Sequence, residues 1–271
     1  MSFSNWLFGT MENPVTNGRW GILHIITMLI CVALIVAFHF IVKHAKQKEK
    51  TRKIILSALV YSVLFFEIAS RVVYIIKKFY LHTPDMEGLS MLWIIIPKPW
   101  CAISCWLLVA SVFVNKKFFY NFAGLSALLC AVIFFSYPGV GFNNKYILFD
   151  NLYSICTHAL LLTTAITMIV LRFTEFKYRE IWKLGICFLL TFIYGLVQIY
   201  FLKTATDPMY FMPNGDIQAG ILHISYGLYL FLYITFLLVY INAFYLVEDR
   251  KNVKEFICRL LSKRADKESN S

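Results

Sequence analysis

Long apolar stretches recur along the whole chain, separated by short polar segments. Each has about 20 residues, the length that a helix needs to cross a hydrocarbon layer of about 30 Å. They lack the period-two alternation that is typical of membrane strands. The pattern predicts an all-α polytopic membrane protein. Its seven transmembrane helices are expected at residues 20–43, 54–76, 89–114, 118–137, 151–172, 181–202 and 220–246.

The third stretch contains residues that a lipid-embedded helix tolerates poorly. Residues 96–101 are Ile-Pro-Lys-Pro-Trp-Cys, in the middle of the predicted span 89–114. Pro97 and Pro99 have no amide hydrogen, and each restricts the residue before it. We therefore expect the helix to open or kink here, and the freed carbonyl groups to need water or protein partners.

The composition agrees with a membrane protein. Of the 271 residues, 59% are hydrophobic and 15% are charged, whereas about 25% of the residues of a soluble domain are charged. Once the spans are removed, too little chain remains for a soluble domain. The predicted organisation is an external segment at residues 1–19, a seven-helix membrane domain at 20–246 and a basic cytoplasmic tail at 247–271. The first residues do not resemble a cleaved signal peptide.

The net charge of +11 follows the membrane topology rather than a nucleic-acid-binding surface. Basic residues gather in alternate connections, at residues 43–53, 116–117 and 172–183 and in the tail after Asp249. By the positive-inside rule, these connections and the C-terminus lie in the cytoplasm and the N-terminus lies outside. The expected partners are membrane lipids, with the basic tail against anionic headgroups at the cytoplasmic face.

The seven cysteines do not form a disulfide framework, because six lie within predicted spans and one in the tail. Acceptor sites for N-glycosylation are absent, and Phe, Ile, Tyr and Lys are abundant. These features favour a bacterial protein, and we expect a multi-pass protein of the bacterial plasma membrane. No cofactor and no metal ion are predicted, and the oligomeric state is left open.

Polar side chains from five predicted spans fall at similar depths in the outer half of the membrane. They are Glu67, Arg71, Lys98, Cys101, His158, Gln198 and His223. Such residues are rare at this depth and mark functional sites by default. Glu67 and Arg71 are four residues apart, so they share a helix face with the acid placed favourably. The cluster predicts one polar cavity that opens toward the outer leaflet.

Simpler explanations stay open for four members of this cluster. Glu67 and Arg71 would serve only to neutralise each other. Lys98 would extend its ammonium group to the interface, as lysines near helix ends do. His158 would be a hydrogen-bonded packing residue.

Three short motifs connect the chain with a known family: residues 96–101 with the following Ala-Ile-Ser, the step Thr157-His158-Ala159, and Met-Tyr-Phe-Met at 209–212 ahead of Pro213. In these motifs the sequence resembles the YwaF-like integral membrane proteins of bacteria, which are related to the transmembrane protein 164 family. The resemblance covers most of the chain from the first span to the seventh. Pro99 stands where the family pattern, Leu-Pro-Leu-His-Leu-Cys, has histidine.

The resemblance implies a seven-helix fold and acyl transfer between phospholipids through a cysteine. Carried over to this chain, it assigns Cys101 as the nucleophile and His158 as its base. A thiol beside histidine can attack an ester carbonyl and hold the acyl group as a thioester. The predicted substrate-binding residues are Glu67, Arg71, Lys98, Trp100, Gln198 and His223.

The same residues are also compatible with two alternatives to acyl transfer. The first is a non-enzymatic transporter, channel or receptor that binds a small solute or ion at Glu67, Arg71, Lys98 and His158, next to the broken third span. The second is a metal site built from Cys101, Cys105 and His158, for which no established ligand motif is present.

Overall fold

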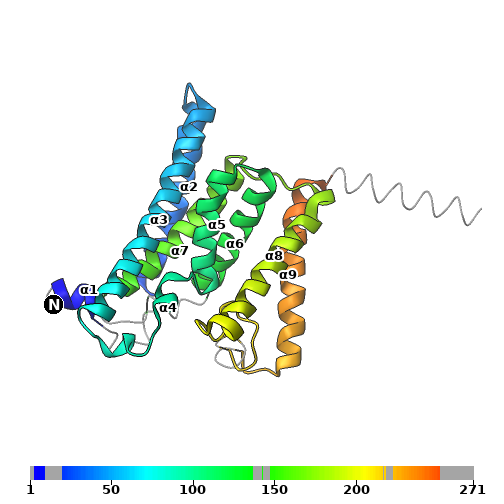
Figure 1. The fold of residues 1–271 in the computed structure, drawn as a ribbon. Coiled ribbons are helices and arrows are strands. Elements are labelled where there is room, and N and C mark those ends of the chain that lie inside the picture. The colour runs from blue at the N-terminus through cyan, green and yellow to red at the C-terminus, as the bar shows by residue number, and fades with distance from the viewer. Residues whose placement is uncertain are drawn as a thin grey trace, which may run out of the picture. The chain divides into compact units, whose positions relative to one another are not determined.

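The computed structural model describes residues 3–9, 20–136, 142, 147–215, 217 and 222–250 (Figure 1). All regular structure in these residues is helical, which confirms the expected all-α class. The helices are α1 (Phe3–Phe8), α2 (Ile22–His44), α3 (Lys48–Phe79), α4 (Met91–Ile95), α5 (Trp100–Val114), α6 (Lys117–Ser136), α7 (Phe149–Val170), α8 (Ile181–Val197) and α9 (Tyr226–Glu248). Three short helical segments accompany them: the 3-10 helices η2 (Pro84–Met86) and η3 (Tyr178–Glu180) and the π-helix η4 (Gln198–Leu202).

Six of the helical segments described are long and apolar enough to cross a membrane: Ile22–His44, Lys48–Phe79, Lys117–Ser136, Phe149–Val170, Tyr178–Leu202 and Tyr226–Glu248. Large apolar side chains are exposed along α2 and α9. Ile22 is 79% exposed and Phe231 is 66% exposed. Apolar faces of this extent are avoided on soluble monomers and are expected of helices that face lipid. The fold is therefore that of a membrane-embedded, multi-pass protein.

The predicted third span, residues 89–114, is not one continuous helix. The five-residue helix α4 ends at Ile95, and α5 begins at Trp100 and has 15 residues. Residues 96–99 between them have extended backbone at Ile96 and Pro99, and the Lys98–Pro99 peptide bond is cis. The expected opening of the helix at the two prolines is confirmed.

The chain divides into two compact units. The first takes in Met1–Thr174 and Tyr194–Met209, and the second takes in Glu175–Ile193 and Tyr210–Ser271. In the first unit α2 and α3 form a hairpin, and α7 packs against α2, α3 and α6 (Figure 1). The most enclosed side chains there include Leu125 and Leu161, both 0% exposed. The candidate site lies in this unit, where α3 and α7 meet the broken third span.

The second unit is held together by aromatic contacts and by a helix cap. Phe176 lies 5.2 Å from Tyr245 and Phe192 lies 6.2 Å from Tyr233, measured between ring centroids. At the end of α9, the Asp249 carboxylate accepts a hydrogen bond from the backbone amide of Tyr178 at 2.7 Å. These contacts fix the start of α8 against α9.

Two helix starts differ by several residues from those predicted. α3 begins at Lys48 rather than at residue 54, because the basic segment before the apolar run continues the helix. α9 begins at Tyr226, later than the predicted residue 220. The aromatic N-terminal segment forms the short helix α1, whose Trp6 packs edge-on against Phe149. The predicted basic tail lies outside the described residues from position 251 onward.

Candidate functional site

Glu67 is the centre of a buried hydrogen-bonded network. Its side chain is 1% exposed, on the face of α3 that packs against α7. One carboxylate oxygen accepts a hydrogen bond from the Arg71 guanidinium at 2.5 Å. The other accepts a hydrogen bond from the Tyr153 hydroxyl of α7 at 2.6 Å. The predicted pairing of Glu67 with Arg71 is confirmed, and the carboxylate also joins two helices.

Arg71 connects this network to the end of α4. Its Nη1 donates to the Glu67 backbone carbonyl at 3.1 Å as well as to the carboxylate, and its Nε donates to the Ile95 carbonyl at 3.3 Å. The guanidinium carbon lies 5.7 Å from the ring centroid of Trp106, within the range of a cation–π interaction. Arg71 therefore binds the last residue of α4, immediately before the break.

The backbone of the break is satisfied by other parts of the first unit. The Pro97 carbonyl accepts a hydrogen bond from Nε2 of Gln198 at 2.9 Å. The Trp100 amide, at the start of α5, donates to the Pro208 carbonyl at 2.9 Å. Gln198 is fully buried and is the first residue of the π-helix η4. A π-helical turn is wider than an α-helical turn, and the Gln198 side chain extends from it to the break. The predicted need for partners is thus met by protein groups.

Lys98, at the middle of the break, has a different environment. Its ammonium nitrogen lies 3.5 Å from the ring centroid of Trp93 on α4. That nitrogen is enclosed, and it has no hydrogen-bond acceptor among the described residues. Besides this burial, the positive charge of Arg71 acts on the ammonium group by repulsion. We call Glu67, Arg71, Trp93 and Lys98 the helix-break cluster.

Trp100 lies inside the helix packing and is 1% exposed. Its indole nitrogen donates to Oγ of Ser126 on α6 at 2.8 Å, and Ser126 is hydrogen-bonded to Ser104 of α5 at 2.7 Å. Ser104 is in turn 3.4 Å from the sulfur of Cys130. These contacts anchor the first turn of α5 on α6, which fixes the end of the break.

The predicted catalytic pair lies on α5 and α7. Cys101 occupies the first turn of α5. His158 stacks on Phe134 with 3.8 Å between ring centroids, and its Nδ1 is hydrogen-bonded to the Ser154 carbonyl at 2.7 Å. Within the described part of the chain, no hydrogen bond joins Cys101 to His158. Their catalytic roles stay a prediction.

The structure also bears on the predicted binding residue His223 and on the alternative of a metal site. His223 belongs to the second unit, where it is exposed shortly before α9. The alternative prediction of a metal site is wrong. Among the residues that the structure describes, no three His, Cys, Asp or Glu side chains lie close enough together to bind a metal ion. Cys101, Cys105 and His158 therefore do not form such a site.

Tyr153 and Trp93 belong to the site but were not among the residues predicted from the sequence. Tyr153 lies on the predicted fifth span two residues after Asn151, and a tyrosine hydroxyl at that depth was a usable signal. Trp93 lies five residues before Lys98 but looked like an ordinary apolar residue. Pro208 contributes only its backbone carbonyl, so no side-chain pattern could have pointed to it.

Comparison of the chain with family models, with curated proteins and with solved structures gives no match. The resemblance to the YwaF-like proteins therefore stays a prediction, and function has to be inferred from the site itself. Chemically, the helix-break cluster has two cations and one carboxylate, and that carboxylate is already bound to Arg71 and Tyr153. Such an arrangement suits an anion.

Proposed function

We propose that the protein is a non-enzymatic membrane protein that binds an anionic group, of the phosphate or carboxylate type, at the break between α4 and α5. The observation that carries this proposal is the ammonium group of Lys98, which is enclosed, stacked on Trp93 and without a hydrogen-bond acceptor among the described residues. An ammonium group removed from water is costly unless an acceptor or an opposite charge is supplied.

The charge balance supports the same proposal. Glu67 is the carboxylate that is hydrogen-bonded to Arg71, and both of its oxygens are engaged. Lys98 is therefore left as the uncompensated cation of the cluster, next to a guanidinium that repels it. A bound anion would accept hydrogen bonds from Lys98 and reduce that repulsion. Lysine binds phosphate and carboxylate as a point charge, so it suits this task.

In the proposed topology the α4–break–α5 segment is the third of seven spans, the N-terminus is outside and the C-terminus is cytoplasmic. The charge distribution between spans supports this orientation. It puts the helix-break cluster in the outer half of a bacterial plasma membrane. Broken spans with a ligand between their halves are a recurring feature of transporters, and this favours a transport or receptor role. The exposure of Ile95 (51%) and Trp106 (37%) favours access from the lipid side.

The proposal is tested by thermal unfolding of the purified protein in neutral detergent, followed by tryptophan fluorescence. The probes are inorganic phosphate, acetate and phosphatidylglycerol, because a ligand that binds only the folded state raises the Tm. We expect at least one probe to raise the Tm of the wild type, and Lys98→Gln to reduce that increase. Lys116→Gln, which removes an exposed lysine elsewhere in the first unit, should keep it.

The three probes separate the possible sources of the anion. A response to phosphatidylglycerol alone identifies a lipid headgroup, whereas a response to phosphate or acetate identifies a soluble anion. Equal Tm shifts in the wild type and Lys98→Gln would show that the anion binds elsewhere. The absence of any shift in the wild type would contradict the proposed function.

Phospholipid acyl transfer is a second candidate function, favoured by the position of Cys101 three residues after Lys98 in the first turn of α5. Nε2 of His158 would take the thiol proton, the thiolate would attack an ester carbonyl, and the displaced lysophospholipid oxygen would receive the proton. The hydroxyl group of an acceptor lysophospholipid would then attack the Cys101 thioester, and its proton would pass through His158 to the departing thiolate. This chemistry requires His158 to approach Cys101 while its Nδ1 keeps the hydrogen bond to the Ser154 carbonyl.

Lipid analysis of membranes tests this candidate directly. Cells that express the wild type should differ in acyl-chain distribution from cells that express Cys101→Ala, and Cys187→Ala should behave like the wild type. Cys187 is the control because it lies in the second unit. If the Cys101→Ala membranes match those of the wild type, acyl transfer through this cysteine is ruled out.

A further inference from the structure

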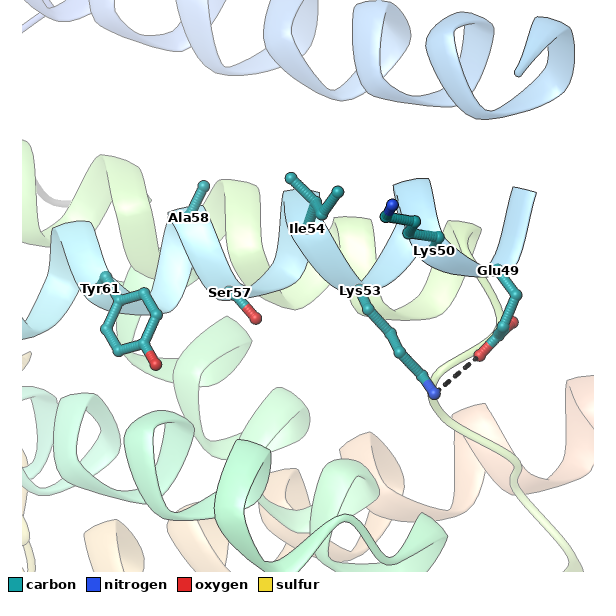
Figure 2. A pocket seen from close by; sticks show the side chains of 7 residues that line it. All are labelled: Glu49, Lys50, Lys53, Ile54, Ser57, Ala58 and Tyr61. Atoms are coloured by element: carbon teal, nitrogen blue, oxygen red, sulfur yellow. Dashed lines mark ion pairs between the residues drawn. The ribbon is translucent and has the colours of Figure 1, made fainter. Parts of the chain in front are cut away.

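The opposite end of α3 carries an open hollow of about 640 Å³, away from the helix-break cluster. All of its lining residues belong to α3: Glu49, Lys50, Lys53, Ile54, Ser57, Ala58 and Tyr61 (Figure 2). Lys53 and Arg71 are 18 positions apart on this helix, which corresponds to about 27 Å along its axis. The two sites are therefore separate, and we call this one the α3 hollow.

The side chains that line the α3 hollow form two rows with a spacing of four residues. Lys50, Ile54 and Ala58 make one row, and the row from Glu49 through Lys53 and Ser57 to Tyr61 makes the other (Figure 2). Residues four apart follow one another along a helix face, so the space between the rows runs nearly parallel to the axis. The small side chains of Ser57 and Ala58 leave this space empty.

Each row begins with charge and continues with apolar surface. Ile54 is 58% exposed and Tyr61 is 59% exposed, so both are free to contact another molecule. The lysines lie at the N-terminal end of α3, within a segment (residues 43–53) that has six lysines and arginines and one glutamate. A lysine pair followed by an exposed apolar groove is complementary to an amphiphile with an anionic head.

The glutamate does not neutralise this end of the helix. Glu49 pairs with Arg52 at 2.8 Å and with Lys53 at 3.7 Å. Lys50 forms no ion pair within the part of the chain that the structure describes. Glu49 thus forms an exposed ion pair with the Lys53 ammonium beside the hollow. Lys50 and Lys53 extend to opposite sides of the helix axis and so flank the hollow (Figure 2).

We propose that the α3 hollow is a binding site for one anionic phospholipid of the cytoplasmic leaflet. Its phosphate binds Lys50 and Lys53, and one acyl chain lies along Ile54, Ala58 and Tyr61. The eight positions from Lys53 to Tyr61 extend about 12 Å along the helix, enough for the upper part of an acyl chain. The site does not depend on the function proposed for the helix-break cluster, and a static lipid there would orient the α2–α3 hairpin in the membrane.

Native mass spectrometry of the full chain released from neutral detergent tests this proposal, because it counts bound lipids one by one. Phosphatidylglycerol and phosphatidylcholine are the probes. We expect the first phosphatidylglycerol to bind more tightly than the first phosphatidylcholine. Each lysine at an anionic lipid surface changes binding by about five-fold. Combined Lys50→Gln and Lys53→Gln should therefore weaken binding of the first phosphatidylglycerol by about 25-fold. Lys46→Gln with Lys48→Gln, in the same basic segment but outside the hollow, should change it much less.

A second variant tests the groove without changing its charge. Ala58→Leu fills the space between the two rows and should remove the first bound lipid, whereas Ala33→Leu, the same change on an exposed face of α2, should not. The proposal is overturned if both lysine pairs have equal effects, or if Ala58→Leu binds phosphatidylglycerol like Ala33→Leu. It is also overturned if Ala58→Leu changes the proportion of dimers instead, since the hollow would then hold a second copy of this chain.

Discussion

Two charged regions of α3 differ in the way their charges are satisfied. At Glu67 and Arg71 the ion pair is enclosed, and its remaining hydrogen bonds go to Tyr153 and to the end of α4. At Lys50 and Lys53 the charges lie at the surface, beside an open apolar hollow. The difference follows from solvation: on α3 the two charges out of water are bound within the protein, whereas the charges at the membrane surface remain available for a partner.

The largest effect is expected from breaking the enclosed pair. Glu67→Ala leaves the Arg71 guanidinium without its carboxylate, and loss of one partner of a buried pair costs about 3–5 kcal/mol. The free energy of unfolding, measured by SDS titration in mixed micelles, should fall by this amount. Glu49→Ala removes an exposed carboxylate from the same helix, and its cost should stay below about 1 kcal/mol. Equal losses for the two variants would remove the distinction between the regions.

Tyr153→Phe sharpens the comparison by removing one hydrogen bond and keeping the ring. The hydroxyl donates to a carboxylate at 2.6 Å, and a hydrogen bond to a charged group contributes about 2 kcal/mol. We expect a loss of that size in the same titration. Tyr61→Phe is the matched control, because Tyr61 is 59% exposed at the α3 hollow. A larger loss at Tyr61 would contradict this prediction.

Gln198→Ala tests whether the break depends on the partner of its backbone. The substitution leaves the Pro97 carbonyl without the hydrogen bond from Gln198, and an unsatisfied buried acceptor costs about 1–3 kcal/mol. Hydrogen exchange should become faster at the Trp100 and Cys101 amides, where α5 begins. Asn242→Ala, which removes an exposed side-chain hydrogen bond within α9, should leave exchange at these amides unchanged. If exchange there is the same in Gln198→Ala and wild type, other contacts hold the break.

The smallest effect on stability is expected at the surface region. Combined Lys50→Gln and Lys53→Gln should change the free energy of unfolding in lipid-free detergent by less than about 0.5 kcal/mol, since exposed side chains contribute little. The same SDS titration measures it. A loss close to that of Glu67→Ala would show that these lysines support the fold and are not reserved for a partner.

Much of the fold could be predicted from the sequence. A continuous run of apolar residues long enough to cross a bilayer favours the α-helix, because the helix satisfies every amide within the segment. The break at Pro97 and Pro99 was equally predictable, because a missing amide hydrogen is a local property. The pairing of Glu67 with Arg71 was predictable for the same reason, since a spacing of four residues fixes it within one helix.

The partners from other helices could not be predicted in this way. The hydrogen bond from Tyr153 to Glu67 joins residues 86 positions apart, and the one from Gln198 to Pro97 joins residues 101 positions apart. Their formation depends on how α3, α7 and η4 pack, which no local pattern encodes. The same limit applies to Cys101 and His158: similar depth on two spans does not determine whether they meet.

The sequence by itself determined the helical class, the apolar spans, the helix break and the one ion pair that lies within a single helix, because each follows from residues close together in the chain. Only the tertiary structure decided how the charges are used. Packing surrounds Glu67 with hydrogen bonds and leaves the Lys98 ammonium on a tryptophan ring without an acceptor. The free energy of a buried charge depends on which groups surround it, and for these residues those groups come from distant parts of the chain.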